Sequence, residues 1–168
     1  KHIKEFNPQE GVQYETIMGI DPGYKDPTGG VVLKYDPYDD VFWAVWEYCV
    51  AGKNTAVHAE QFVNIIERYE VESVFVDSAA AQFRADLAAE YDISASKSKK
   101  AINDGISHVQ ALIAGDRLMI DPSCTDLILV MNNYRWDPND ALLKPKPLHD
   151  KYSHLADALR YALYTYVR

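Results

Sequence analysis

Cysteine is scarce in this sequence. The chain of 168 residues contains two cysteines, Cys49 and Cys124. Two cysteines cannot form the disulfide framework of a small secreted domain, and they do not supply the four ligands of a zinc knuckle. They are ordinary for a protein of a reducing compartment.

Long apolar runs are also missing. No window approaches the roughly 20 apolar residues of a membrane-spanning helix, and the polar start, Lys1–Pro8, lacks the apolar core of a signal peptide. We therefore expect a soluble, unexported protein with no membrane partner. Because the first residue is lysine and not methionine, we also expect a piece of a longer polypeptide, with residues 1–14 as a leader or linker.

Positive charge is in deficit. The sequence has 17 Lys and Arg against 25 Asp and Glu, which gives a net charge of -8. This balance argues against a protein that coats nucleic acid by bulk electrostatics, although an enzyme that binds DNA locally remains compatible with it. The lysines are clustered, and each cluster is either a set of phosphate contacts or a solvated loop. The clustered lysines are Lys97, Lys99 and Lys100, and then Lys144, Lys146 and Lys151.

The pattern of apolar residues predicts a single α/β domain over residues 1–168. The composition, 48% hydrophobic and 25% charged, suffices for one core, and the sequence has no repeats. Three closely spaced strands predict an antiparallel meander, after which helices and strands alternate. The first predicted strand ends at residue 21, and the others cover 31–35, 41–50, 74–76, 93–96 and 118–120. The predicted helices cover 54–69, 79–91, 101–115, 125–134 and 152–168. A proline-rich loop is predicted over 137–148.

Two of the predicted strands end in an aspartate. Asp21 closes the run MGID (18–21), and Asp77 closes VFVD (74–77). If the strands are parallel neighbours, both carboxylates reach the same carboxyl edge of the sheet, where open α/β sheets bind ligands. Adjacent unpaired carboxylates repel unless a cation lies between them. The alternative is that each aspartate only caps a turn or a helix.

A third aspartate lies on the last predicted helix, in the segment HLADALRYA (154–162). Asp157 is nearly opposite the apolar stripe of that helix, which fits either a solvated position or a site. Its small neighbours Ala156 and Ala158 would let the helix approach a sheet edge, and His154 shares its face. Three carboxylates on three elements indicate a site for a divalent cation, and carboxylate oxygens suit Mg²⁺ or Mn²⁺; we expect two such ions and no organic cofactor. Asp26 and Asp150 are weaker candidates.

The order of elements and several motifs resemble the ribonuclease H-like fold, a central mixed sheet with helices on both faces. Nearer still, the segments MGIDPG (18–23), VFVDS (74–78), SKSKK (96–100), YRW (134–136) and HLADALRYA (154–162) are similar to the C-terminal nuclease domain of tailed-bacteriophage large terminase subunits. The resemblance implies a metal-binding triad of Asp21, Asp77 and Asp157 with His154 as a site neighbour.

That resemblance also implies an activity and partners. The domain would hydrolyse phosphodiester bonds of concatemeric double-stranded DNA during genome packaging, in the host cytoplasm, together with an N-terminal ATPase domain, a small terminase subunit and a portal. The chain contains no phosphate-binding motif of the G-x-x-x-x-G-K-[ST] type, so the ATPase domain is absent from it.

Three other functions compete with this one. An actin-like phosphotransferase also begins with a strand that ends in aspartate, but it needs a second phosphate loop that the chain lacks. A Holliday-junction resolvase shares the fold and the metal chemistry. A non-catalytic DNA-docking module of a packaging motor would retain the fold with an inactive site.

Overall fold

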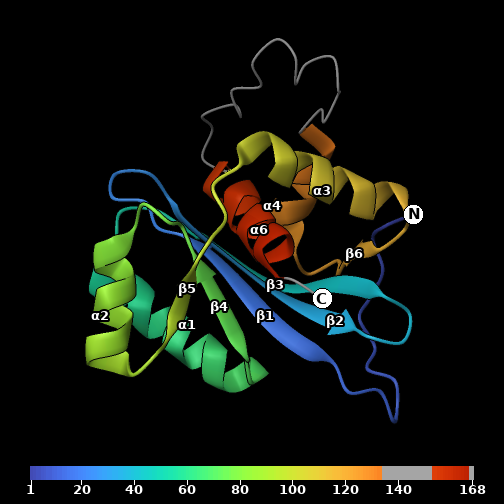
Figure 1. Ribbon diagram of the computed structural model, residues 1–168, viewed down its shortest axis with the longest axis horizontal. Coiled ribbons are helices and arrows are strands. Elements are labelled where there is room, and N and C mark those ends of the chain that lie inside the picture. Colours follow the sequence, from blue (N-terminus) through green and yellow to red (C-terminus); the bar gives the residue numbers. More distant parts are fainter. Residues whose placement is uncertain (134–152, 167–168) are drawn as a thin grey trace.

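The short apolar runs of the sequence form one six-stranded sheet. The computed structural model describes residues 1–133 and 153–166, and in it the strands follow the order β5-β4-β1-β2-β3-β6 (Figure 1). The strands are β1 (Glu15–Asp21), β2 (Thr28–Asp36), β3 (Val41–Val50), β4 (Ser73–Val76), β5 (Ala95–Lys97) and β6 (Leu118–Ile120).

The helices lie close to where the sequence predicts them. They are α1 (Thr55–Tyr69), α2 (Ala81–Tyr91), α3 (Ile102–Ala114), α4 (Thr125–Asn133) and α6 (Ser153–Thr165). Helix α2 begins two residues later than predicted, because the Asp77 carboxylate accepts a hydrogen bond from Ala79 N at 3.1 Å and holds a turn. The predicted loop 137–148 lies outside the described residues.

The strand directions place the carboxyl ends of β1 and β4 together. Strand β1 pairs with β2, and β2 with β3, in antiparallel fashion, whereas β4 pairs with β1 in parallel. Strands β5 and β6 add in parallel to β4 and β3 at the two edges. The predicted mixed sheet, three antiparallel strands followed by parallel ones, is therefore confirmed. Because Ile20 is the register partner of Val76, the next residues, Asp21 and Asp77, come to one edge.

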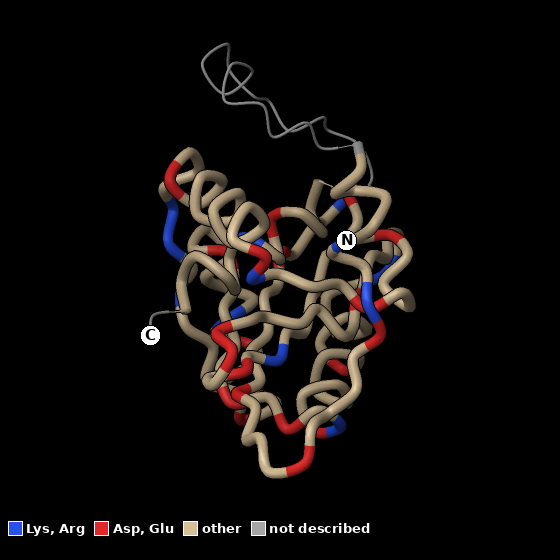
Figure 2. Tube along the Cα trace, turned by 90° about the vertical axis from the view of Figure 1, so that its right-hand side faces the viewer, with Lys and Arg blue, Asp and Glu red and all other residues tan. Residues whose placement is uncertain are grey.

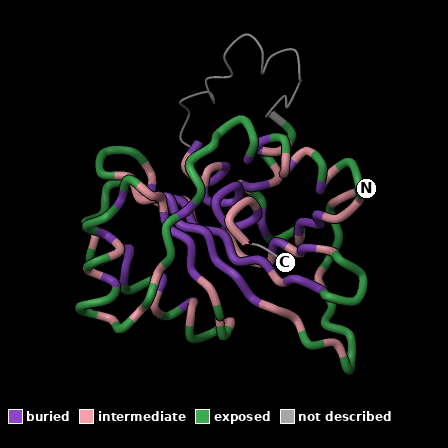
Figure 3. Tube along the Cα trace, in the orientation of Figure 1, coloured by how far each residue is buried: buried purple, intermediate pink, exposed green. Residues whose placement is uncertain are grey.

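Helices cover both faces of the sheet, as predicted. Helices α1 and α2 lie on one face, and α3, α4 and α6 on the other (Figure 1). Side chains alternate along each strand, so Met18 and Ile20 enter the core under α1 and α2, while Ile17 enters the core under α6. Figure 3 shows the buried strands between mostly exposed outer loops.

Helix α6 is more deeply buried than a helix with a single apolar stripe. It packs against β1 and β2 on one side and against α3 and α4 on others, so that even Arg160 is only 5% exposed. The sequence predicts one stripe because the pattern of apolar residues does not reveal how many partners a helix has.

Two strand glycines bring α6 unusually close to the sheet. A Cβ atom at Gly19 would lie 1.9 Å from the carbonyl oxygen of Ala158, and one at Gly29 would lie 2.3 Å from that of His154. The small residues that permit the approach are therefore on both elements, and the helix crosses the face of the sheet instead of meeting an edge. This crossing carries His154 and Asp157 to the end of β1.

The first residues of the chain continue the sheet beyond β6. Lys4 N donates to Ile120 O at 3.0 Å, and Ile120 N donates to His2 O at 2.8 Å. Within the described residues, no helix has both the length and the apolar character needed to cross a membrane.

Candidate metal centre

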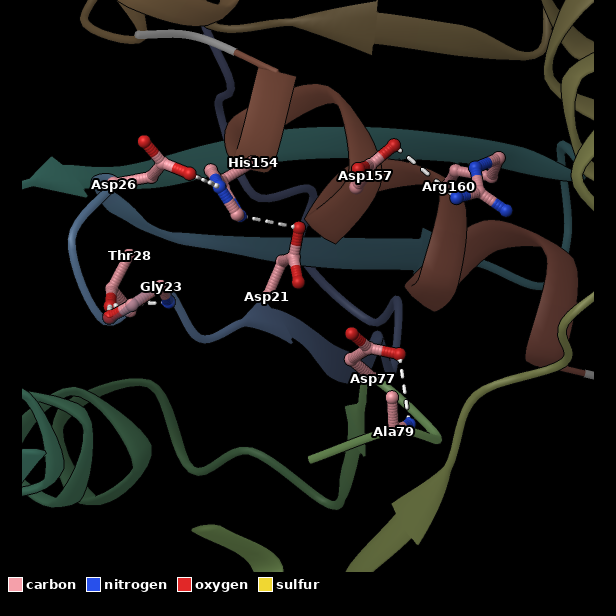
Figure 4. Close-up of polar contacts among 9 residues, drawn as sticks. All are labelled: Asp21, Gly23, Asp26, Thr28, Asp77, Ala79, His154, Asp157 and Arg160. Carbon is pink, nitrogen blue, oxygen red and sulfur yellow. Dashed lines mark hydrogen bonds and ion pairs between the residues drawn. The ribbon is translucent and has the colours of Figure 1, made fainter. Parts of the chain in front are cut away.

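Three aspartates from three elements lie around the carboxyl ends of β1 and β4. Asp21 is the last residue of β1, Asp77 follows β4, and Asp157 lies on α6. In Figure 4 the carboxyl group of Asp21 lies between those of Asp157 and Asp77. The structure thus brings together the three residues that the sequence singled out, although they are separated by 56 and 80 positions along the chain.

The charged form of the Asp21 carboxyl group is destabilised by its surroundings. Its side chain is only 5% exposed, and this burial raises the pKa of Asp21 to about 6. The hydrogen bond with His154 opposes the rise, whereas the negative charges of Asp157 and Asp77 add to it. A cation at this edge would relieve both the burial penalty and the repulsion among the carboxylates.

His154 connects two acidic side chains. Its Nδ1 atom lies 2.8 Å from Asp21 Oδ2, and its Nε2 atom lies 3.6 Å from Asp26 Oδ2. The hydrogen bond with Asp21 is the main cause of the raised pKa of His154. His154 is thus a neighbour of the site, as the resemblance implies, and Asp26 is linked to Asp21 through this histidine.

Asp77 and Asp157 are each held by a neighbour. The Asp77 carboxylate accepts from Ala79 N, and the guanidinium of Arg84 donates to Asp77 O at 2.6 Å. Asp157 Oδ1 lies 3.3 Å from Nη2 of Arg160. A carboxylate has two oxygens, so the turn-capping and ligand roles of Asp77 are compatible.

Arg160 is a site residue that the sequence reasoning missed. Its guanidinium is buried, and its Nη1 atom has no hydrogen-bond partner among the described residues. Such a charge is stable only beside an opposite charge, which Asp157 supplies. The spacing of three residues between Asp157 and Arg160 on one helix is the signal that could have identified the pair.

The donor chemistry of the site fits a hard divalent cation, but the donors are not yet gathered around one point. Carboxylate oxygens are the ligands that Mg²⁺ and Mn²⁺ prefer. Within residues 1–133 and 153–166, however, no group of three or more His, Cys, Asp or Glu side chains is close enough to hold a metal ion. In Figure 4 one oxygen of each carboxylate is directed toward its own partner, which leaves the second oxygen for another ligand.

The first lysine cluster adjoins Asp77. Lys97 is the register partner of Val76, and Ser98 Oγ accepts from Ser78 N at 3.2 Å, so β5 ends beside the acidic edge. The side chains of Lys97, Lys99 and Lys100 are exposed. Lys99 also lies over the Tyr164 ring, with Nζ 5.1 Å from its centroid.

The other predicted contacts cannot be placed. Lys144, Lys146, Lys151 and Asp150 lie outside the described residues. Figure 2 shows short basic segments scattered among more numerous acidic ones in the described part of the chain. Any DNA contact there must therefore be local.

Comparisons of the sequence and of the structure with known proteins agree on the family of this chain. Residues 18–165 match the family described as the terminase RNase H-like domain. The chain is 45% identical over 175 residues to the large subunit of the terminase of Escherichia phage T5, and this match covers 99% of the chain but 40% of the relative. The chain thus spans about two fifths of the length of the curated relative that it matches.

Solved structures share the fold. The large terminase of a thermophilic bacteriophage in complex with ADP matches with a TM-score of 0.80 and 26% identity, covering 98% of this chain and 42% of that one. The nuclease domain of the bacteriophage SPP1 large terminase with bound Mn matches with a TM-score of 0.70 and 24% identity. This match covers 95% of this chain and 93% of that one. At that identity the second match shows the fold alone.

Proposed function

The chain belongs to the terminase RNase H-like domain family, and from this premise we propose that it is the metal-dependent endonuclease domain of a phage large terminase. Its substrate would be concatemeric double-stranded viral DNA, cut during genome packaging in the host cytoplasm. The observation that carries the proposal is the convergence of Asp21, Asp77 and Asp157 at one sheet edge, where burial and mutual repulsion leave Asp21 in need of a cation.

In this proposal each residue of the site has its own role. Asp21, Asp77 and Asp157 hold Mg²⁺ or Mn²⁺. Two such ions would supply Lewis-acid polarisation of the phosphodiester and a nucleophile at neutral pH. His154 orients Asp21 and can carry a proton, and Arg160 orients Asp157.

The proposed partners lie outside the chain. Because the chain covers 42% of the thermophilic-phage large terminase that was crystallised with ADP, an ATPase domain of the same polypeptide is the first of them. Residues 1–14 would then link that domain to a single nuclease domain, and double-stranded DNA, the small terminase subunit and the portal complete the set.

Cleavage should depend on a divalent cation of the right size. We expect Mn²⁺ and Mg²⁺ to support cleavage of a supercoiled plasmid, whereas Ca²⁺ should bind and support little cleavage, because its larger and looser coordination sphere positions the reacting groups less well. Gel analysis of plasmid incubated with each ion, and with EDTA, is the measurement. Cleavage that survives exhaustive chelation would refute the metal mechanism.

Cleavage assays with further DNA substrates distinguish the proposed nuclease from a junction resolvase and from a docking module. A junction substrate cut in preference to linear duplex would identify a resolvase-like enzyme. Failure to cut any DNA with Mn²⁺, combined with binding of duplex, would identify a docking module. Preferential cleavage of linear duplex is the result that the proposal requires.

The exposed lysines beside Asp77 should contribute to DNA binding. Replacing Lys97, Lys99 and Lys100 together by alanine should weaken binding and reduce the dependence of log K on log salt by roughly one unit per lost phosphate contact. Fluorescence titration of a duplex from low salt upward measures this slope. Lys1, 72% exposed near the opposite end of the sheet, provides the control Lys1→Ala. A triple variant with the wild-type slope would mean that the cluster is only a solvated loop.

A further inference from the structure

The loop between β1 and β2 presents an exposed aromatic ring next to the acidic edge. Tyr24 is 80% exposed, the highest value among the large hydrophobic side chains of the described residues, and it follows Asp21 by three positions. Lys25, beside it, is also exposed. Single exposed apolar residues are ordinary on protein surfaces, so exposure alone indicates nothing.

The base of this loop is fixed by contacts on both sides. The Thr28 hydroxyl accepts from Gly23 N at 3.0 Å and lies 3.3 Å from Gly23 O, to which it donates. On the other side, Asp26 Oδ2 lies 3.6 Å from His154 Nε2. Figure 4 shows both contacts, which tie the loop to the same histidine that contacts Asp21.

The turn is also sterically tight at its first glycine. A Cβ atom at Gly23 would lie 2.4 Å from the carbonyl oxygen of Asp26 and 2.7 Å from that of Pro27. The loop is therefore closely packed at Gly23, where its two ends meet, and Tyr24 directly follows this packed position.

The negative charge of the site makes a DNA contact that does not depend on positive charge useful there. Asp21, Asp77 and Asp157 repel a phosphate backbone, and the whole chain carries a net charge of -8. Packing of an aromatic ring on a deoxyribose of a duplex, or its insertion between base pairs that it partly unstacks, does not depend on positive charge, so it adds to DNA binding where electrostatic attraction is weak. Lys25, exposed beside the ring, would supply one positive charge for a phosphate there.

We propose that Tyr24 is a DNA-stacking residue of this site, whose ring packs on the base or deoxyribose of a nucleotide next to the scissile phosphate while Lys25 contacts the adjoining phosphate. This inference rests on the proposed nuclease function and extends it to a specific substrate contact. Because the side chain is exposed, its replacement leaves the core intact.

The experiment compares two tyrosines of similar exposure. Tyr38 is 75% exposed in the β2–β3 turn, at the opposite end of β2 from Tyr24. Tyr24→Ala, Tyr24→Phe and Tyr38→Ala are compared with the wild-type chain in two assays: binding of a fluorescein-labelled duplex in Ca²⁺, and steady-state plasmid cleavage in Mn²⁺. Lys25→Ala is included for the salt dependence.

Each variant has a defined expected result. Tyr24→Ala should raise Kd and KM about tenfold, equivalent to ~1.4 kcal/mol of lost stacking, with kcat and the salt slope little changed. Tyr24→Phe should bind like the wild type because it keeps the ring, and Tyr38→Ala should have no effect. Lys25→Ala should reduce the salt slope by about one unit.

The contrary outcomes are separable. If the wild type cuts DNA and Tyr24→Ala binds as tightly, Tyr24 has no stacking role. If Tyr24→Phe is as weak as Tyr24→Ala, the hydroxyl and not the ring makes the contact, and stacking is likewise refuted. If the wild type neither binds nor cuts duplex, the proposed function itself fails.

Discussion

Replacing Asp77 or Asp157 by asparagine is expected to reduce DNA cleavage at least about a hundredfold at saturating Mn²⁺. Loss even of residues that only support metal ligands lowers activity roughly 10- to 100-fold in characterised metal sites, and removal of a carboxylate ligand should do more. Initial rates of plasmid cleavage over a range of Mn²⁺ concentrations measure the effect.

The stability of the two variants in EDTA should differ, although both remove a charge from the acidic edge. In Asp77→Asn the amide oxygen can still accept from Ala79 N, and less repulsion acts on Asp21, so the melting temperature should hold or rise. In Asp157→Asn the buried Arg160 loses its anionic partner, so the free energy of unfolding should fall by about 2 kcal/mol.

Asp39→Asn provides the matched control. Asp39 is exposed in the β2–β3 turn, away from the acidic edge, so this variant should cut DNA and melt like the wild type. A variant of Asp77 or Asp157 that retains the wild-type rate would exclude that residue from the site.

Gly19→Ala should have the largest effect on stability. The added methyl group would lie 1.9 Å from Ala158 O, an atom of the helix backbone that cannot rotate away, so α6 must shift off the sheet. Overpacking of this kind costs about 3 kcal/mol, and it should also reduce cleavage because α6 carries His154 and Asp157. Urea denaturation followed by circular dichroism measures the first effect.

A second glycine shows whether the effect is steric. Gly115 is exposed after α3, with φ near -85°, and the nearest atom to an added Cβ would be 3.3 Å away. Gly115→Ala should therefore change the free energy of unfolding by less than about 1 kcal/mol. If Gly19→Ala were equally mild, the close approach of α6 to β1 would not be required for the fold.

The local sequence determined the elements and the identity of the acidic residues. The short continuous apolar runs within 15–21 and 73–76 can be recognised from the sequence without the fold, and so can the aspartate that ends or follows each strand. The motif around Asp157, in order with those around Asp21 and Asp77, indicated the family that the comparisons show.

The tertiary structure decided how these residues meet. Helix α6 crosses β1 and β2, and α3 and α4 cover its other sides. Because of this crossing, His154 contacts Asp21, which lies 133 positions earlier in the chain, and Gly19 faces Ala158. For the same reason Arg160 is a buried partner of Asp157. Helical periodicity fixes which residues share a face, but it does not fix what packs against that face. Strand register and helix crossing arise from contacts between distant segments, and for that reason the histidine contact, the arginine and the strand glycines emerged only from the fold.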